Sequence, residues 1–452
     1  MSDSYFIEFI SRFTILIVLS ISFYLFAPTI KLALLLSIIL LVFFFDLKTI
    51  LTFKNFIIIY MFVLFVIAGM LYYENSEITS QLMVDFIIYS ISLFVGYNFF
   101  LLLPKQKRNI IHKFDDNLYK LKVKLEKIIL LLIFINYFFL FVTIISEGIV
   151  DFYTGKYLVK KIFTYGQKNI IEGLKQILNY IAFYFSVAIS IFYISICYSS
   201  HLRPRIEYII IQFIIFPLLS LSRGIFLNGV MFIIISQFIF KGKISVMKIF
   251  LFAILVLLIA VFFGIIRELA LLSFSVYYND LEEILERFVK GEFSQIIAYA
   301  EIKNNISQLN YQYGKTILLP LLTKLIPRSI FPDKPFNSAG YFMYMIYPES
   351  AKFGFFLAPT IFGSIFLNFG YVGCIILSFS IGILAAYFDY LIKLIIKKNI
   401  TNILKVALVI LIFMNLYNIL RNDIVESFFL NFTIYIFILI IKRFFKRYFA
   451  TA

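Results

Sequence analysis

The chain of 452 residues contains no tryptophan, only two cysteines and only two histidines, and 15% of its residues are charged. A soluble domain carries about 25% charged residues, so a soluble globular enzyme is excluded. Cys197 and Cys374 lie inside apolar runs, which predicts two free thiols and excludes a disulfide framework. The histidines, His112 and His201, do not form a Cys/His ligand set with them, so no metal site is expected.

The chain is rich in long apolar segments. Hydrophobic residues make up 62% of it and aromatic residues 20%. The apolar runs are unbroken, for example at 128–145 and 249–266, whereas strands of a membrane β-barrel alternate apolar and polar residues. We therefore predict an all-α polytopic membrane protein. The first apolar run lacks a small-residue cleavage pattern, and we expect it to be a retained span.

A membrane-crossing helix needs about 20 predominantly apolar residues. By this criterion the sequence predicts twelve transmembrane helices, near 6–26, 29–45, 55–73, 82–103, 128–147, 177–199, 206–222, 225–240, 247–266, 371–392, 405–420 and 424–441. One further apolar run, at 355–369, contains Pro359 and Gly363 and is followed by Gly370.

The distribution of basic residues predicts the orientation. Lysine and arginine concentrate in every second connecting segment, above all at 105–127, 393–405 and 442–447. Because such segments stay in the cytoplasm, we predict that both termini are cytoplasmic and that the net charge of +16 is largely this topological signal, not a nucleic-acid-binding surface. A crossing at 355–369 would place 393–405 outside. We therefore predict a re-entrant or interfacial helix there, which must be covered by protein or line a wet cavity.

The predicted organisation has three parts. Residues 1–266 form transmembrane helices one to nine, 267–370 form a large periplasmic loop with amphipathic or re-entrant helices, and 371–452 form the last three spans and a basic cytoplasmic tail. Within the loop, Asn279 and Ser294 are predicted to begin two helices, because both residue types favour the N-cap position.

Arginines at the outer ends of spans are candidates for a binding site, because charge is costly in a membrane. Arg223 lies in the hairpin before 225–240, Arg267 ends the ninth span and Arg421 ends the eleventh. The spans before Arg223 and Arg421 are short, which predicts that these arginines are recessed in a cavity. The N-termini of the helices that follow them open onto the same cavity. Such a set fits a multiply charged anion, since a guanidinium group can bind two phosphate oxygens at once.

Each candidate also has a structural interpretation. Arg267 and Arg421 can complement helix dipoles or extend to the interface. Asp423, followed three residues later by Glu426, resembles a capping box. Glu268 can pair with the adjacent Arg267.

Other polar residues leave the same choice open. The proline-rich segment 326–335 either holds Arg328 and Lys334 above the cavity or is a plain turn. Asp85 and Asp389 lie near span ends, and we expect both to be solvated.

Short motifs follow one another in order over residues 220–430: Ser222-Arg223-Gly224, Arg267, Tyr313-Gly314-Lys315, Pro327-Arg328 through Lys334-Pro335, Asn368-Phe369-Gly370 and Arg421-Asn422-Asp423. In these motifs the chain resembles the bacterial O-antigen polymerases (Wzy-type), which belong to the oligosaccharide repeat-unit polymerases. The resemblance implies a GT-C-type glycosyltransferase of the inner membrane. Such an enzyme moves a growing glycan from undecaprenyl pyrophosphate onto another lipid-linked repeat unit on the periplasmic side. The resemblance also implies that no nucleotide sugar, metal or other cofactor is needed, and that a chain-length-regulating co-polymerase is a partner.

By the resemblance, the candidate ligands of the pyrophosphates are Arg223, Arg267, Arg328 and Arg421, with Lys334 beside them. The acceptor hydroxyl needs a general base, and both histidines are expected to face the cytoplasm. The carboxylates that remain are Glu268, Asp280, Asp333, Asp423 and Glu426. We favour Glu268 or Asp423, because each adjoins an arginine.

Two other functions remain open from the sequence. An O-antigen ligase-like GT-C enzyme would differ in its acceptor. A lipid-linked oligosaccharide flippase would favour charges near the midplane of the membrane and short loops.

Overall fold

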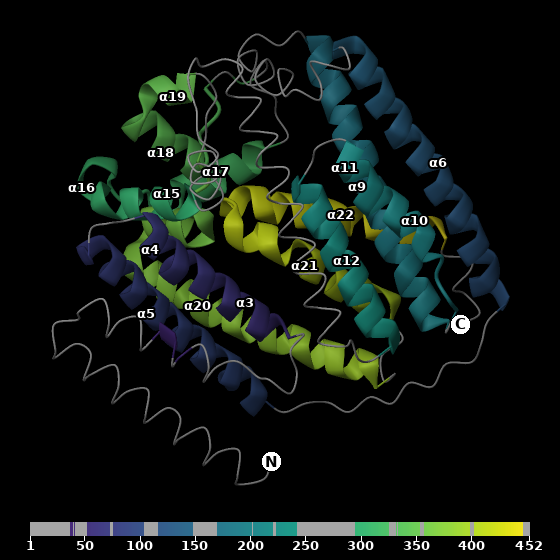
Figure 1. Cartoon of the computed structure of the whole chain (residues 1–452), viewed down its shortest axis with the longest axis horizontal. Coiled ribbons are helices and arrows are strands. Elements are labelled where there is room, and N and C mark those ends of the chain that lie inside the picture. Colours follow the sequence, from purple (N-terminus) through teal and green to yellow (C-terminus); the bar gives the residue numbers. More distant parts are fainter. Residues whose placement is uncertain are drawn as a thin grey trace, which may run out of the picture. The chain divides into compact units, whose positions relative to one another are not determined.

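The computed structural model describes residues 37, 38, 40, 331 and the ranges 52–72, 76–103, 116–147, 170–200, 202–219, 223–241, 294–324, 333–352, 357–397 and 402–445 (Figure 1). Within these ranges all regular secondary structure is helical, which agrees with the predicted helical class. Six of the described helices are long and apolar enough to cross a membrane: Phe53–Met70, Glu77–Leu102, Tyr119–Val142, Ile181–Ser199, Thr360–Ile396 and Ile424–Phe444. Three shorter apolar helices, Ile206–Ile215, Phe226–Lys241 and Ile403–Leu416, accompany them.

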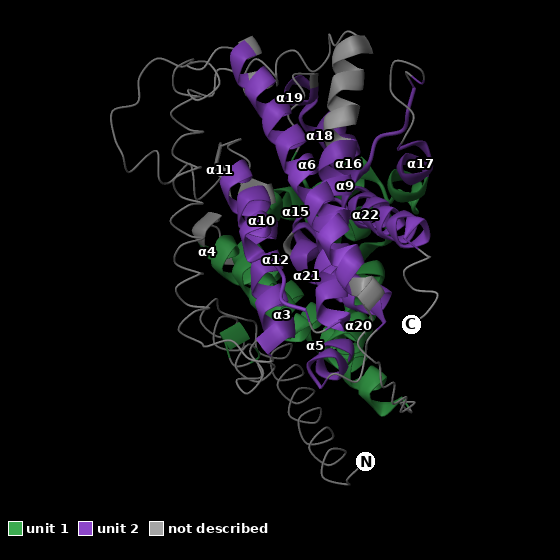
Figure 2. Cartoon of the chain, turned by 90° about the vertical axis from the view of Figure 1, so that its right-hand side faces the viewer, with its two compact units in different colours: residues 1–106, 293–318, 357–390 green, residues 107–292, 319–356, 391–452 purple. Residues whose placement is uncertain are grey.

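The chain forms two compact units, coloured separately in Figure 2. Unit 1 comprises residues 1–106, 293–318 and 357–390, and unit 2 comprises 107–292, 319–356 and 391–452. Segments of the predicted periplasmic loop therefore belong to both units. Nine of the twelve predicted spans coincide with described helices. The spans predicted at 6–26 and 247–266, and most of that at 29–45, lie outside the described residues.

The described part of unit 1 contains three long helical segments, residues 53–72, 76–102 and 360–390, the last of which is most of α20. Helices α3 (Phe53–Phe62) and α4 (Ala68–Tyr72) are joined by the π-helical turn η1 (Val63–Ile67) without a break in helical geometry. Helices α5 (Ser76–Leu102) and α20 (Thr360–Ile396) pack closely, because Gly96 and Gly382 each face a main-chain carbonyl of the other helix. Small residues permit this approach, which is common between helices in membranes. The short helices α15 (Ser294–Asn304) and α16 (Ile306–Leu309) belong to the same unit.

A break in α20 separates the apolar run at 355–369 from the following span. Gly370 has φ +63° and ψ −156°, so helix geometry is interrupted there. The part before it, residues 360–369, rises only about 15 Å at 1.5 Å per residue. A crossing needs about 30 Å. This part is too short to cross a bilayer by itself, whereas α20 as a whole is long enough to span.

Unit 2 is organised around α9 (Ile170–Ser199), which contacts α6 (Asp116–Glu147), α21 (Ile403–Arg421) and α22 (Ile424–Phe444). The other helices of unit 2 that the structure describes are α10 (Ile206–Ile210), η2 (Ile211–Ile215), α11 (Phe216–Leu219), α12 (Arg223–Lys241), α18 (Ser338–Ile346) and α19 (Pro348–Lys352). Helix α17 (Lys315–Thr323) begins in unit 1 and ends in unit 2.

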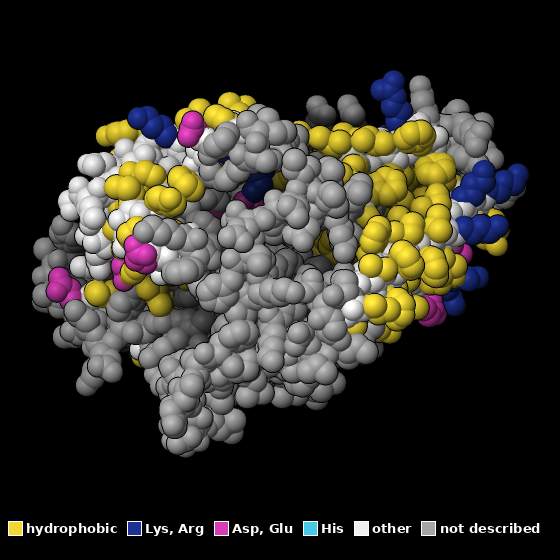
Figure 3. All heavy atoms as spheres, turned by 90° about the horizontal axis from the view of Figure 1, so that it is seen from above, with side chains coloured by type: hydrophobic (Ala, Val, Ile, Leu, Met, Phe, Trp, Pro, Cys, Tyr) yellow, Lys and Arg dark blue, Asp and Glu magenta, His cyan; other side chains and the backbone are white. Residues whose placement is uncertain are grey.

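The position of α9 and α6 determines what each helix exposes. Residues 186–198 of α9 are all buried, whereas α6 exposes Leu131, Phe134, Phe138, Phe141 and Ile145 along one face. A helix face of this kind is unfavourable in water and suits the hydrocarbon core of a bilayer. Figure 3 shows broad areas of hydrophobic side chains on the described surface, with lysine and arginine near the margin of one of them. The helices are those of a membrane-embedded protein.

Candidate functional site

The structure describes part of the predicted site. Arg421, Asp423, Lys334, Glu426 and Asp333 are described with their side chains, and Arg223 begins helix α12. The other sequence-predicted residues, Arg267, Glu268, Asp280, Arg328, Asn279, His112 and His201, lie outside the described residues. Ser294 begins α15, as predicted.

Asp423 connects two helix N-termini in unit 2. It is the N-cap of α22, where its Oδ1 accepts a hydrogen bond from the Val425 N–H at 2.8 Å. Its Oδ2 accepts from the Ala339 N–H at 3.2 Å, in the first turn of α18. The carboxylate is buried, with the residue 1% exposed. One side chain therefore satisfies main-chain donors of two helices that are distant in sequence.

This geometry corrects one expectation about the site. We expected the N-terminus of the helix after Arg421 to present free N–H groups to an anion. The buried carboxylate of Asp423 already occupies that position. Asp423 thus makes the capping interaction considered from the sequence, but Glu426 does not complete a capping box. Its carboxylate forms an ion pair with Lys324 instead.

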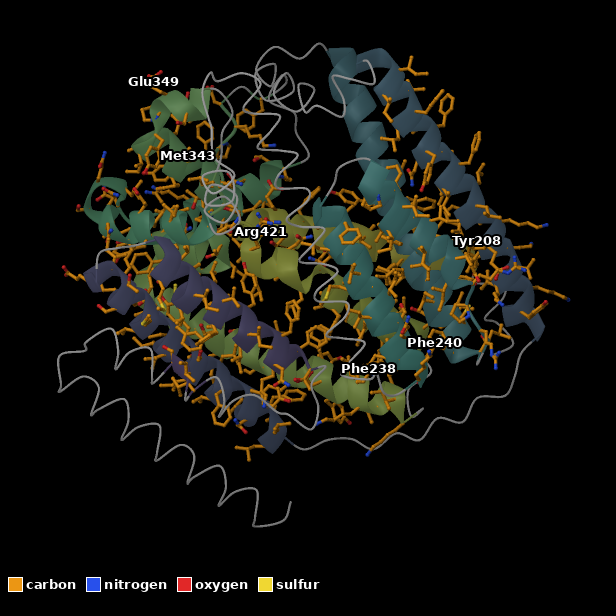
Figure 4. All side chains as sticks on the ribbon, in the orientation of Figure 1. Tyr208, Phe238, Phe240, Met343, Glu349 and Arg421 are labelled. Atoms are coloured by element: carbon orange, nitrogen blue, oxygen red, sulfur yellow. The ribbon has the colours of Figure 1, made fainter. Side chains whose placement is uncertain are left out.

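Three cationic side chains, Lys324, Lys334 and Arg421, lie near the start of α22, and we name them the cationic cluster. Lys324 reaches Glu426 in the first turn of α22. The Lys334 Nζ donates to the Lys324 main-chain oxygen at 3.0 Å, which places these two residues together. Arg421 is the last residue of α21, two positions before Asp423, and is half-buried (Figure 4). Cations from two segments that are distant in sequence are thereby gathered near the start of α22.

An asparagine ladder links the two helices that carry Arg223 and Arg421. The Asn228 Nδ2 donates to the Asn415 Oδ1 at 3.2 Å, and the Asn418 Nδ2 donates to the Asn228 Oδ1 at 3.1 Å. Arg223 is about a turn and a half along α12 from this ladder, and Arg421 is about one turn along α21. The fold therefore brings the main chain at Arg223 into the neighbourhood of Arg421.

Two motifs of the resemblance meet in unit 1. The Tyr313 N–H donates to the Asn368 main-chain oxygen at 3.1 Å. The Asn368 Oδ1 accepts from the Gly314 N–H at 2.9 Å and from the Thr316 hydroxyl at 3.1 Å. Gly314 has φ +85° and Gly370 has φ +63°, which a residue with a Cβ rarely adopts. Tyr313-Gly314-Lys315 and Asn368-Phe369-Gly370 therefore build a defined corner beside the break in α20.

Two buried carboxylates of unit 1 contradict the expectation of solvated groups. Asp85 forms an ion pair with Lys303 at 2.8 Å and accepts from the Tyr299 hydroxyl at 2.9 Å. Asp389 accepts from the Phe53 N–H at 2.7 Å and from the Tyr97 hydroxyl at 3.1 Å. Both residues are buried. The expectation was wrong because the partners come from distant segments, which the spacing of apolar residues does not reveal.

The ion pair keeps Lys303 charged in a buried position. Burial lowers the pKa of its ammonium group, but the charge of Asp85 and hydrogen bonds to Asp85 and Tyr371 offset this, so that the pKa is raised. Lys303 also lies over the Tyr371 ring, 5.0 Å from its centroid. Sequence reasoning missed this cluster, whose signals were Asp85 inside the predicted span 82–103 and Lys303 in the helix 294–304.

Among the described residues, no group of three or more His, Cys, Asp or Glu side chains is arranged to hold a metal ion. Comparison of the chain with protein-family models, with curated protein sequences and with solved structures finds no significant match.

Proposed function

We propose that this protein is a membrane glycosyltransferase that polymerises oligosaccharide repeat units linked to undecaprenyl pyrophosphate. The reaction would take place on the periplasmic side of a bacterial inner membrane, on O-antigen or a related surface polysaccharide. The observation that carries the proposal is the cationic cluster at the start of α22, together with the ladder that brings the start of α12 close to Arg421. A chain-length-regulating co-polymerase is the partner that the sequence resemblance adds to this proposal.

The chemistry of a lipid diphosphate suits this arrangement. Its anion lies at the membrane surface while its polyprenyl chain lies among apolar helices. Arginine is the residue best able to hold two phosphate oxygens at once, and lysine adds point charge. In transfer from a diphosphate, negative charge develops on the leaving group, and fixed cations lower the barrier by stabilising it. Because Asp423 caps α22, the main-chain N–H groups of that helix are not the proposed anion ligands. The proposed ligands are the side chains of the cationic cluster.

The general base is assigned by the same reasoning. A base must come within hydrogen-bond reach of the acceptor hydroxyl. Asp423 is buried and its two oxygens accept from main-chain N–H groups, so it suits a positioning role better than proton transfer. Of the two carboxylates favoured from the sequence, we therefore propose Glu268 as the base.

The test compares arginine variants in cells and in a purified system. Arg223→Ala and Arg421→Ala should leave the protein present at normal level but yield surface glycan with a single repeat unit. Arg443→Ala is the matched control and should leave long glycan unchanged. This exposed arginine lies in the last turn of α22, at the opposite end from Arg421. Long glycan from both site variants would refute the assignment of these residues.

The same system separates the alternative functions. The purified protein with lipid-linked repeat units alone should elongate them. A ligase-like enzyme would need a different acceptor. If the protein is a flippase, the purified protein would not elongate the units, and its deletion would block translocation of lipid-linked units rather than their elongation.

A further inference from the structure

An apolar surface in unit 1 has no role in the proposed reaction. It consists of Tyr313, Leu318, Phe369, Tyr371 and Val372, which we name the corner patch. These side chains are 40% to 76% exposed. They come from two segments that meet where Gly370 breaks α20. Exposed apolar side chains are unremarkable singly, but a contiguous group marks a surface that contacts something other than water.

The corner patch is held rigidly. The Gln312 N–H donates to the Leu367 oxygen at 3.0 Å, and Asn368 binds both the Tyr313 and Gly314 main chain. A Cβ placed on Gly314 would lie 3.4 Å from the Phe369 ring and 3.6 Å from Leu318, so these two side chains meet over the glycine. Their outward position is therefore a property of the packed corner and not of a loose loop.

The corner patch also continues a surface that faces lipid. Val372 and Ile376 lie one turn apart on the same face of α20, and both are at least 60% exposed. The part of α20 that carries them belongs to one of the apolar helices long enough to cross a membrane. Side chains exposed on such a helix contact acyl chains. Phe369 and Leu318 extend this face past Gly370 onto segment 311–318.

We propose that the corner patch is immersed in the interfacial layer of the bilayer and that its ligand is bilayer lipid. Leu318, Phe369 and Val372 contact the upper part of the acyl chains. Tyr313 has an apolar ring and a polar hydroxyl, which is the character of residues at the headgroup level. The Tyr371 hydroxyl bonds to Lys303, so Tyr371 contributes only the exposed part of its ring. Lys315 is exposed next to them and adds attraction for anionic headgroups. This immersion fixes the depth of the turn between residues 360–369 and the following span. It does not depend on the proposed enzymatic function.

The absence of tryptophan makes a direct test possible, because one introduced tryptophan is the only indole in the protein. The full chain carrying Leu318→Trp is placed in phosphatidylcholine vesicles that contain phosphatidylglycerol. Their acyl chains are unbrominated, brominated near the headgroup, or brominated near the chain end. We expect a blue-shifted emission and a loss of fluorescence that is greater with bromine near the headgroup. Val372→Trp, on the same surface, should behave alike and covers the case in which Leu318→Trp does not fold.

Two controls bracket the result. Ile376→Trp, on the exposed face of α20, should be quenched by brominated lipid, whereas Glu349→Trp, exposed on α19, should be quenched by aqueous acrylamide only. If the tryptophans at 318 and 372 behave like the one at 349, the corner patch faces water and the proposal is overturned. If they are shielded from both quenchers, a protein surface covers the patch, and the proposal is equally overturned.

Discussion

At the residue scale, Asp389 and Asp423 each accept a hydrogen bond from a helix N-terminus that is far away in the sequence. Asp389 accepts from the first N–H of α3, and Asp423 accepts from N–H groups of α18 and α22. Each helix N-terminus has main-chain donors without an intrahelical partner, and a carboxylate there is stabilised by the helix dipole as well. A negative charge near a membrane helix end is thus satisfied by the main chain of its neighbours.

Replacing Asp423 should therefore lower the stability of the protein, and any loss of glycan elongation should follow from that. Asp423→Ala removes a cap worth about 1 kcal/mol. It also leaves the buried Ala339 N–H without its acceptor, at about 1–3 kcal/mol. Asp423→Asn keeps one acceptor oxygen for the cap and should be milder. Thermal unfolding in detergent measures both. Full stability of Asp423→Asn combined with complete loss of glycan elongation would contradict the positioning role and indicate proton transfer.

The pair of Asp85 and Lys303 should show strong coupling. Removing one partner leaves the other buried and uncompensated, at about 3–5 kcal/mol of unfolding free energy. We expect Asp85→Ala and Lys303→Ala each to lower the unfolding temperature, and the double variant to lower it by much less than the sum. Lys315→Ala, at an exposed lysine of the same unit, is the matched control and should have little effect. Additive losses would show that the ion pair is not coupled.

At the element scale, the close contact of α5 with α20 depends on two glycines. A Cβ on Gly96 would overlap the Phe379 carbonyl group, and one on Gly382 would overlap the Leu93 carbonyl group. Main-chain atoms in a helix cannot move aside as a side chain can. The helices must therefore separate if either glycine acquires a side chain. Asp389 is part of α20, so its hydrogen bond to the start of α3 would be disturbed as well.

We expect Gly382→Ala to destabilise the protein by about 1–3 kcal/mol, the usual cost of overpacking. Gly69→Ala is the comparison, because the nearest atom to its Cβ would be the end of the Leu82 side chain, at 3.1 Å, which can adjust. Unfolding temperatures of the two variants provide the measurement. Equal shifts would mean that the α5–α20 contact is less tight than the structure describes.

At the scale of the whole molecule, acidic side chains join segments that are separate in sequence within each unit. In unit 2, Lys122 and Arg205 both reach Glu126, whose Oε1 also accepts from the Tyr193 hydroxyl. In unit 1, Asp389 meets the start of α3. In both places the joined helix ends are ones predicted to be cytoplasmic, so the contacts are consistent with the positive-inside assignment of the chain.

Thiol labelling in intact cells tests that orientation. Both native cysteines are buried and should stay unlabelled. A membrane-impermeant maleimide should label Glu349→Cys directly, because α19 belongs to the predicted periplasmic loop. It should label Lys124→Cys, exposed at the basic start of α6, only after permeabilisation. The reverse pattern would invert the topology and remove the proposed site from the periplasm.

Most of the helical architecture was predictable from single-chain patterns. Apolar runs long enough for a bilayer identify membrane helices whatever their neighbours, because every main-chain polar group must be satisfied within its own segment. The nine described counterparts of predicted spans follow from this rule. Proline and glycine in and after the run at 355–369 also indicated that it is not an ordinary span.

The tertiary structure alone decided how the polar residues are used. From the sequence, Asp423 was predicted to be either a helix cap or a general base, and Asp85 was expected to be solvated near the end of a span. The fold surrounds both with donors from segments tens to hundreds of residues away. It likewise brought Lys324 and Lys334 to the start of α22. Burial in lipid depends on local composition, which the sequence states directly. The partner of a buried charge depends on which helices pack together, and that is settled only when the chain folds.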